Sequence, residues 1–566
     1  MLLPRICAFM PVEVRLCFLQ SLIPFFFWTK IADLNALLGT PAARYIQSRP
    51  VAVNPNNDAS IDQIQGWLKW CDTHHTCAHT DLPSLPTRVV DLTHNPTVVE
   101  TRGQRGKYIA LSYCWGTSRK NLLLTQSTLH AFQTKGVEMT QLPKTIQDAI
   151  LVTKKLGVRY IWIDALCIIQ QEPDLKDFKI EAPKMAEYYS NAYLTIAVGS
   201  ASDCGDGFLN DRSPSEAAPC EIEYSRPNPL DRSQVNASGN IYLCLPSSEE
   251  TGPIRTRAWT FQESELGRRV LTYRTEQYSF KCQREERFEN GDLRTVECDL
   301  SKYLQMYSTE FIAPSLDAII GSGHKDLVPN LYRRWEVSVG EYTARSMTNH
   351  SDKFAAIAGI AKHLQKVIGG KYLYGLWEGD LIAGLLWRTY SGSPHWRSAS
   401  RDVYRAPSWS WASIDGRIDC VRRDVNQDKR IRDRRNWRVK IVSHNAIAGF
   451  LDPIRVEVAI PAAYELHIQG VLKSLRNLRD GGYELYDTSQ IGQASLQRVG
   501  QSTSLCTCKF DVLADYSAIQ VQAVELTTSE GLLLQHVDDK RYRRIGYFTV
   551  VFEVFERGRI QDIFLI

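Results

Sequence analysis

The sequence lacks an excess of charge of either sign. Its 566 residues include 67 lysines and arginines against 63 aspartates and glutamates, a formal net charge of +4. Proteins that bind nucleic acids concentrate basic residues, because phosphate contacts dominate their affinity. The balance therefore predicts no nucleic-acid partner. With 44% hydrophobic and 23% charged residues, the composition is that of a globular protein and not of a disordered chain.

Nucleotide-binding loops and internal repeats are also absent from the sequence. Neither GxxxxGK[ST] nor GxGxxG occurs, so a P-loop or a dinucleotide-binding fold has no support. Without a repeat, solenoid and propeller architectures have no support either. The length exceeds what one hydrophobic core organises, so we expect at least two domains.

The cysteines form no disulfide framework. Fourteen are scattered singly along the chain, and several, such as Cys114 and Cys167, lie inside apolar runs. This pattern is typical of reduced thiols and predicts a cytoplasmic protein.

The N-terminal segment contains an apolar stretch at residues 16–28. It is too short to span a bilayer, Pro24 interrupts it, and no small-residue cleavage site follows. We expect a peripheral or docked segment; membrane contact through residues 1–28 is the less favoured alternative.

Strand-like runs alternate with helical patterns in the first half of the chain. The runs expected to be strands are short, and the one at 160–164 is a continuous apolar run, which is typical of a strand buried on both faces of a parallel sheet. They lie at residues 86–92, 108–114, 160–164 and 193–198, and helices are expected at 61–79, 142–157 and 177–192. The order strand, helix, strand predicts an α/β core in which 108–114, 160–164 and 193–198 are adjacent parallel strands.

The rest of the chain differs in character. Residues 210–256 are rich in proline, serine and asparagine and are interpreted as a surface insertion. A helical pair is expected at 330–370, with tryptophan-rich segments after it that dock the module on the core, and an antiparallel β-rich region at the end. The predicted domain boundaries are 1–60, 61–290, 291–418 and 419–566.

Four segments carry a family resemblance. "YIALSYCWG", "LPKTIQDAI…LGVRYIWIDALCIIQ", "EAPKMAEYYSNAYLTIAV" and "RAWTFQE" with "RVLTY" occur in this order and resemble the fungal heterokaryon-incompatibility (HET) domain. Flanking segments extend the resemblance over most of residues 60–416. One departure is "RAWTFQESELGRRVL", where the family more often has glycine before the tryptophan.

The resemblance implies self/non-self recognition between fungal cells, with the domain acting as an effector that triggers programmed cell death. HET domains are regarded as similar to the TIR fold, which implies a TIR/flavodoxin-like parallel-sheet core. Some TIR proteins cleave NAD and others only assemble. NAD is therefore a candidate substrate, and no cofactor is expected. The resemblance also implies that the protein associates with itself or with an allelic, non-self partner protein. The alternatives are a non-enzymatic assembly module and a regulatory protein of the same family.

Polar residues terminate the apolar strands. Ser112, Tyr113 and Asp164 fall at carboxyl ends of predicted parallel strands, where open α/β sheets bind ligands. Asp164 is predicted to hold ribose hydroxyls, and Tyr113 or Trp115 to stack on a base. We expect these residues to line one cleft with Glu263. The competing interpretation is that the polar residues cap turns and the aromatic residues form core.

Glu263 lies four residues after Trp259, a spacing similar to that of the helix with the catalytic glutamate in TIR enzymes. By that resemblance, Glu263 would stabilise the oxocarbenium-like ribose and Trp259 would contact the substrate. The alternative is a glutamate that pairs with Arg257 or Arg268 on a helix surface.

The segment "CDTHHTCAH" holds five potential metal ligands, Cys71, His74, His75, Cys77 and His79. Their spacing is too tight for a usual zinc finger, and no second cluster follows. The favoured interpretation is no metal, with thiols and imidazoles packed beside the core. A metal site at these five residues is the alternative.

Overall fold

The structure is a computed structural model. It describes residues 33–36, 40, 46, 48–75, 77, 81–117, 121–170, 175–212, 220–227, 235–244, 252–295, 327–390, 397–398, 405–420, 430–444, 465–477, 483–486, 506–511, 520–550 and 559–566. These residues divide into two compact units. The first lies within Met1–Phe178, Tyr188–Arg255 and Gly267–Glu297, and the second within Lys179–Glu187, Thr256–Leu266 and Cys298–Ile566.

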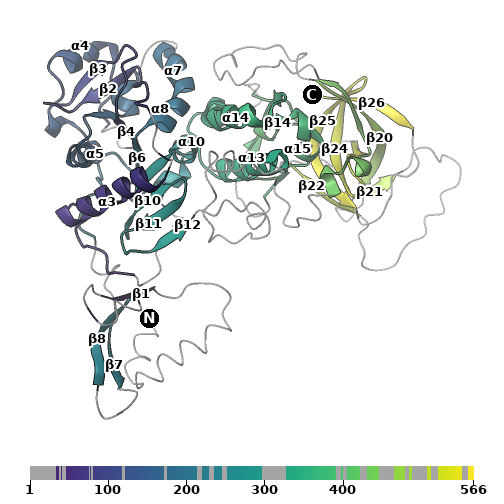
Figure 1. Ribbon diagram of the computed structural model, residues 1–566. Coiled ribbons are helices and arrows are strands. Elements are labelled where there is room, and N and C mark those ends of the chain that lie inside the picture. Colours follow the sequence, from purple (N-terminus) through teal and green to yellow (C-terminus); the bar gives the residue numbers. More distant parts are fainter. Residues whose placement is uncertain are drawn as a thin grey trace. The chain divides into compact units, whose positions relative to one another are not determined.

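The first unit is built on a nine-stranded mixed sheet (Figure 1). Its order is β12-β11-β10-β9-β6-β4-β5-β2-β3. The strands are β2 (Arg88–Asp91), β3 (Thr97–Glu100), β4 (Tyr108–Ser112), β5 (Tyr160–Trp162), β6 (Leu194–Val198), β9 (Arg269–Tyr273), β10 (Tyr278–Cys282), β11 (Glu285–Phe288) and β12 (Leu293–Thr295).

The centre of the sheet is parallel. Ile109 of β4 lies opposite Ile161 of β5 on one side and Leu194 of β6 on the other, and β9 continues the parallel set beside β6. Every residue of β4 and β6 is buried, which explains their continuous apolar sequence. The prediction of three adjacent parallel strands is confirmed.

The sheet is mixed, whereas the sequence predicted a parallel one. β2 and β3 add an antiparallel hairpin at one side, and β10, β11 and β12 add antiparallel strands at the other. Their connections are short, and only antiparallel neighbours can be joined by such tight turns.

Helices of the first half of the chain are α3 (Asp58–His74), α4 (Gln126–Thr134), α5 (Lys144–Lys155), α6 (Asp164–Cys167), α7 (Lys176–Glu181) and α8 (Met185–Asn191). The helix expected at 177–192 is interrupted by a 3₁₀ turn at Ala182–Lys184. Pro183 lies in this turn, because proline fits the first turn of a helix but not its interior.

The predicted insertion at 210–256 contains a hairpin of β7 (Cys220–Pro227) and β8 (Val235–Cys244). β8 also pairs with β1 (Asp33–Ala36), which makes a separate three-stranded antiparallel sheet.

The second unit contains the helices α10 (Trp259–Leu266), α13 (Leu327–Thr343), α14 (Ala355–Ile368) and α15 (Leu381–Leu385). α13 and α14 are the predicted helical pair. Three short two-stranded sheets accompany them: β13 (Tyr372–Leu373) with β14 (Leu376–Trp377), β15 (Arg388–Thr389) with β18 (Ile418–Asp419), and β16 (Arg397–Ser398) with β17 (Ile414–Asp415).

An eight-stranded sheet forms the β-rich C-terminal region. Its strands are β19 (Lys440–His444), β20 (Leu466–Asn477), β21 (Tyr483–Tyr486), β22 (Cys506–Phe510), β23 (Val521–Glu525), β24 (Glu530–Asp538), β25 (Arg541–Val550) and β26 (Ile560–Leu565). All pairs are antiparallel except β25 with β26, so the prediction of a β-rich end is confirmed. The expected strand "VEVAI" lies outside the described residues.

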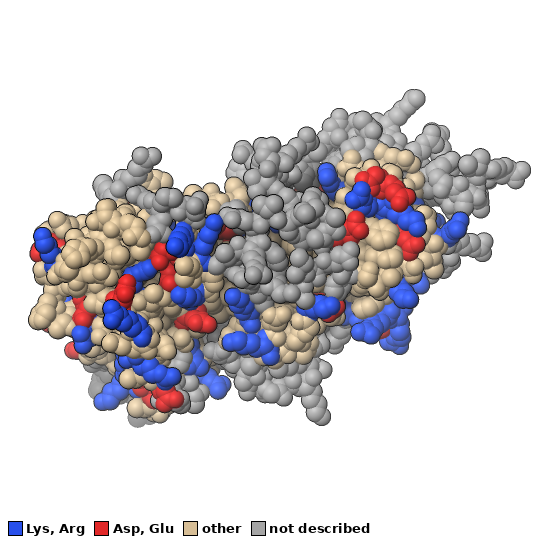
Figure 2. All heavy atoms as spheres, turned by 90° about the horizontal axis from the view of Figure 1, so that it is seen from above, with Lys and Arg blue, Asp and Glu red and all other residues tan. Residues whose placement is uncertain are grey.

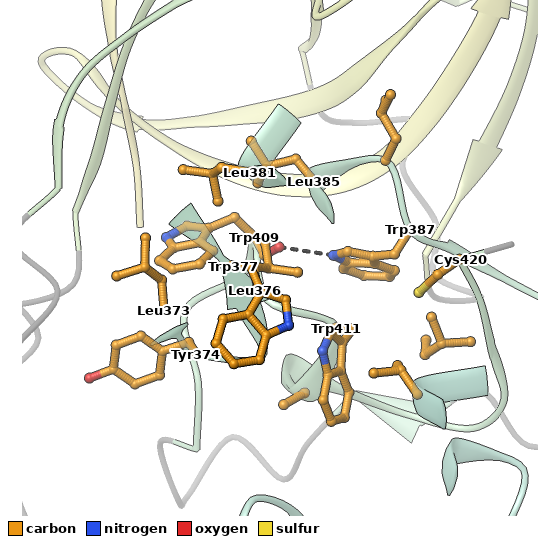
Figure 3. Close-up of a cluster of buried hydrophobic side chains, with 14 of the residues drawn as sticks. Leu373, Tyr374, Leu376, Trp377, Leu381, Leu385, Trp387, Trp409, Trp411 and Cys420 are labelled. Carbon is orange, nitrogen blue, oxygen red and sulfur yellow. Dashed lines mark hydrogen bonds between the residues drawn. The ribbon is translucent and has the colours of Figure 1, made fainter. Parts of the chain in front are cut away.

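Tryptophans form the core of the second unit (Figure 3). The indole of Trp387 donates to the carbonyl of Trp409 at 2.9 Å, and those of Trp411 and Trp335 both donate to the carbonyl of Gly375. Gly375 has φ +93°, and a Cβ there would lie 2.4 Å from the Trp411 indole nitrogen, so the position requires glycine. That these tryptophans dock the module on the α/β core stays a prediction.

Among the described residues, seven buried cysteines form no disulfide, as expected for reduced thiols: Cys71, Cys77, Cys114, Cys167, Cys204, Cys282 and Cys420. Among the described helices, none combines the length and apolar character needed to cross a membrane. The segment 1–28 lies outside the described residues. On the face shown in Figure 2, basic and acidic side chains of the described residues are intermixed.

One buried ion pair joins the tryptophan core to the C-terminal sheet. The guanidinium of Arg544 donates to both carboxylate oxygens of Asp511, at 2.9 and 3.1 Å, and to the carbonyls of Leu385 and Trp387. It also lies over the Trp387 ring, 3.4 Å from its centroid. Both charges are almost fully buried, so each depends on the other.

We predict that Arg544→Met lowers the free energy of unfolding of the second unit by about 3–5 kcal/mol, because it leaves the Asp511 carboxylate buried without its partner. Urea unfolding followed by tryptophan fluorescence measures this. Arg543→Met, at an exposed neighbouring position, is the matched control and should change the free energy by less than about 0.5 kcal/mol. Equal stability of the two variants would contradict the prediction.

Candidate functional site

The order of the parallel strands marks a candidate site in the first unit. β4, the first of them along the chain, lies between β5 and β6, the second and third. The connection after β4 therefore runs to one side, to β5, and the connection after β5 crosses back past β4 to β6. In open α/β sheets, ligands bind outside the carboxyl ends of the strands at such a point of reversal. Residues 113–116 follow β4 there, and residues 199–207 follow β6.

Trp115 and Asp164 contact each other at this edge. The indole nitrogen of Trp115 donates to Oδ2 of Asp164 at 2.9 Å, and the backbone N–H of Ala165 donates to Oδ1 at 2.7 Å. Asp164 is the first residue of α6, where a carboxylate complements the helix dipole. Both side chains are half-buried, so the structure brings two predicted site residues together at a surface that solvent reaches.

Ser112 and Tyr113 are buried, with 2% and 3% of their surface exposed. The hydroxyl of Tyr113 and the amide of Asn121 are hydrogen-bonded, with 3.0 Å between the amide nitrogen and the hydroxyl oxygen. Of the two aromatic residues predicted to stack on a base, only Trp115 therefore presents substantial surface.

The loop after β6 belongs to the same edge and was not predicted as part of the site. Gly116 has φ +76°, and a Cβ there would lie 2.0 Å from a carboxylate oxygen of Asp203. The backbone N–H of Cys204 donates to the Trp115 carbonyl at 3.4 Å. The signal for this loop was available, since a glycine-, serine- and aspartate-rich run follows "YLTIAV" directly.

Glu263 and Trp259 lie on α10, in the second unit. Glu263 is buried, with 5% of its surface exposed, so its side chain does not lie on the helix surface. Pairing with Arg257 or Arg268 stays an alternative. The indole of Trp259 donates to Asp352 at 3.4 Å, and Gln262 accepts from the backbone N–H of Gly359 at 2.8 Å, which fixes α10 beside α14. That Glu263 shares a cleft with Asp164 stays a prediction.

Three of the five potential metal ligands identified in the sequence lie close together, and a fourth possible ligand, Cys282, joins them. The ligand atoms of Cys71, His75, Cys77 and Cys282 all lie within 4.8 Å of one another. His74 points elsewhere: its ring stacks on Trp70 with centroids 3.7 Å apart. His79 lies outside the described residues.

Sequence reasoning missed Cys282. Structural zinc sites commonly pair two groups of ligands, whereas here a single cysteine at the end of β10 joins the first group. The only local signal is a cysteine that ends a strand just before a tight turn, in "YSFKCQREE".

The thiols of this cluster influence one another. Hydrogen bonds from Cys282 and Cys71 lower the pKa of Cys77 to about 3. Hydrogen bonds to Cys282 and Cys77, together with burial, raise the pKa of Cys71 well above its usual value.

Residues 108–263 match the family model described as Heterokaryon incompatibility protein (HET). The matched segment includes β4, β5, β6 and the first five residues of α10, and with them every predicted substrate-binding residue. No curated protein and no solved structure matches the chain. The family match supports a heterokaryon incompatibility-type protein and indicates a role in heterokaryon incompatibility.

The hydrogen bond between Trp115 and Asp164 should be measurable as a coupling energy. We predict about 1 kcal/mol between Trp115→Phe and Asp164→Asn in a double-mutant cycle of unfolding free energies, because the bond has a charged acceptor but lies partly in solvent. A cycle that pairs Trp70→Phe with Asp164→Asn is the control and should give a value near zero. A Trp115 coupling no larger than the control would show that the bond does not fix this edge.

Proposed function

We propose that the protein is an effector of fungal allorecognition that triggers programmed cell death by cleaving NAD at a TIR-like site. The observation that carries this proposal is the half-buried pair of Trp115 and Asp164 at the carboxyl edge of the parallel strands. The pair lies inside the segment that matches the HET model.

The strand order supports a TIR/flavodoxin-like core. Numbered along the chain, the four parallel strands β4, β5, β6 and β9 are arranged as 2-1-3-4 across the sheet. Flavodoxin-like sheets begin in the same order, and they bind their nucleotide cofactor where the first and third strands meet. The equivalent place here is between β4 and β6, where Gly116 and Asp203 approach each other.

In this proposal, Glu263 acts on the ribose during NAD cleavage. The bond between the ribose carbon and the nicotinamide nitrogen breaks, its electron pair leaves with nicotinamide, and the ribose becomes oxocarbenium-like. The Glu263 carboxylate would stabilise that cation, and water would then add to the ribose carbon and release a proton, giving ADP-ribose.

The substrate would be held at the edge of the sheet. A carboxylate accepts about four hydrogen bonds, so Asp164 can bind a ribose hydroxyl while it keeps the hydrogen bond from Trp115. The exposed part of the Trp115 ring offers a surface on which a base can stack. Trp259 would contact the substrate from α10.

A second candidate function is a non-enzymatic module that signals by assembly. The observation that favours it is that Ser112 and Tyr113 are buried and that both oxygens of Asp164 accept hydrogen bonds from the protein. Residues in this arrangement fix loops and need no ligand. In that case, self-association or a non-self partner protein would trigger death without chemistry.

NAD turnover by the purified full-length chain, both soluble and artificially clustered, separates the two functions. We predict that Glu263→Gln and Asp164→Asn each lower turnover at least about 100-fold and abolish cell killing, because they remove the groups that stabilise the cation and hold the ribose. Ser264→Ala, on the same helix, is the matched control and should retain both activities.

Two outcomes would overturn the enzymatic proposal. Killing without NAD loss in the wild-type protein would favour assembly. Unchanged turnover in Glu263→Gln, with unchanged killing, would remove Glu263 from the mechanism.

A further inference from the structure

The end of α3 and the hairpin of β10 and β11 meet in the first unit. Trp67 of α3 packs on Tyr278 and Phe280 of β10, with ring centroids 5.7 and 6.3 Å apart. Gln63, one turn earlier, accepts a hydrogen bond from the Tyr278 hydroxyl at 2.6 Å. These contacts align the last turn of α3 with the end of β10.

Four ligand side chains converge at this junction. Cys71 and His75 are four residues apart at the end of α3, and the backbone N–H of His75 still donates to the Cys71 carbonyl at 3.1 Å. The backbone is extended at His75, and the sulfur of Cys77 lies beside the ligand atoms of Cys71 and His75. Cys282 completes the group, with its sulfur 3.5 Å from Nδ1 of His75, a residue 207 positions away in the sequence.

We propose that Cys71, His75, Cys77 and Cys282 bind one Zn²⁺ ion in a tetrahedral site. Three thiolates and one imidazole form a common donor set of structural zinc sites. Zinc bonds of about 2.3 Å to sulfur and about 2.0 Å to nitrogen place ligand atoms about 3.4–3.8 Å apart, so atoms within 4.8 Å need only small rotamer changes.

The donor set occupies all four positions and leaves none for substrate. Cys71, Cys77 and Cys282 are each at most 2% exposed, and His75 is half-buried. The backbone N–H of Arg284 donates to the sulfur of Cys282 at 3.4 Å, as outer-shell donors do at metal thiolates. A closed site of this kind is structural and not catalytic.

Arg269 provides an independent observation. Its side chain is 1% exposed and its guanidinium donates to Asp72, yet its Nε and Nη1 atoms have no hydrogen-bond partner within the described residues. Arg269 is also the cross-strand partner of Cys282. Zinc with three thiolates and a neutral imidazole carries one negative charge, which is the countercharge that this buried guanidinium needs.

The site would fasten α3 to the sheet. Without a metal, α3 is held against the sheet by aromatic packing, by the hydrogen bond between Gln63 and Tyr278, and by the ion pair between Asp72 and Arg269. These contacts close a long stretch of chain, which costs entropy. A metal that binds only the folded arrangement adds its binding free energy to folding, and the thiol protons leave to solvent. This inference is independent of NAD cleavage, since the cluster lies at the amino end of β9, opposite the carboxyl edge.

Metal analysis of the purified full-length protein tests the proposal. We expect about one zinc per chain by inductively coupled plasma mass spectrometry. Cys282→Ser and His75→Ala should lose it. Their matched controls are Cys204→Ser, a buried free cysteine of the same unit, and His74→Ala, the adjacent histidine, and both should keep it.

Cobalt replacement gives a readout on the wild-type protein, in case the variants fail to fold. Co²⁺ should produce thiolate-to-cobalt charge-transfer absorption, and excess Zn²⁺ should remove it. His75→Cys, which keeps four ligands, should restore binding. A folded wild-type protein without zinc and without this absorption would overturn the proposal, as would a disulfide within Cys71, Cys77 and Cys282.

Discussion

The buried guanidinium of Arg269 is the constraint on which the first unit depends. It lies at the start of β9, the strand where the parallel half of the sheet gives way to antiparallel strands. A buried charge is strongly destabilising unless it is paired, so this strand can form only where countercharge is present. Asp72 at the end of α3 supplies part of it, and the neighbouring cysteines can supply the rest. One charge thus links the position of α3, the β10–β11 hairpin and the sheet.

The same sheet separates two kinds of polar residue. Those at its carboxyl edge, Trp115 and Asp164, are half-buried and bonded to each other, so they can meet a solute. Those at its amino edge, Cys71 and Cys282, are closed off from solvent. The difference in solvent exposure therefore distinguishes the two sites. The Trp115–Asp164 pair can bind and release a ligand, whereas the cysteine cluster can only stabilise the fold.

Local sequence patterns predicted the helices and strands, but they could not predict contacts between residues far apart in the chain. The parallel strands were predictable because burial on both faces leaves an unbroken apolar run, as in β4 and β6. The mixed character of the sheet was missed because strand direction depends on connections beyond the apolar pattern. Cys282 and Arg269 were missed because their meaning comes from a partner about 200 residues away, which no local spacing records.

The candidate site at the carboxyl edge was likewise predicted only in part from the sequence. Sequence placed Ser112, Tyr113 and Asp164 together because all follow parallel strands, and only burial distinguishes Asp164 and Trp115 from the two that are enclosed. Asp203 reaches the edge from a third strand end and approaches Gly116 so closely that a side chain there would collide. A glycine at that position is therefore a requirement of two loops meeting at a switch point, and the place where such loops meet is where an open α/β sheet receives its ligand.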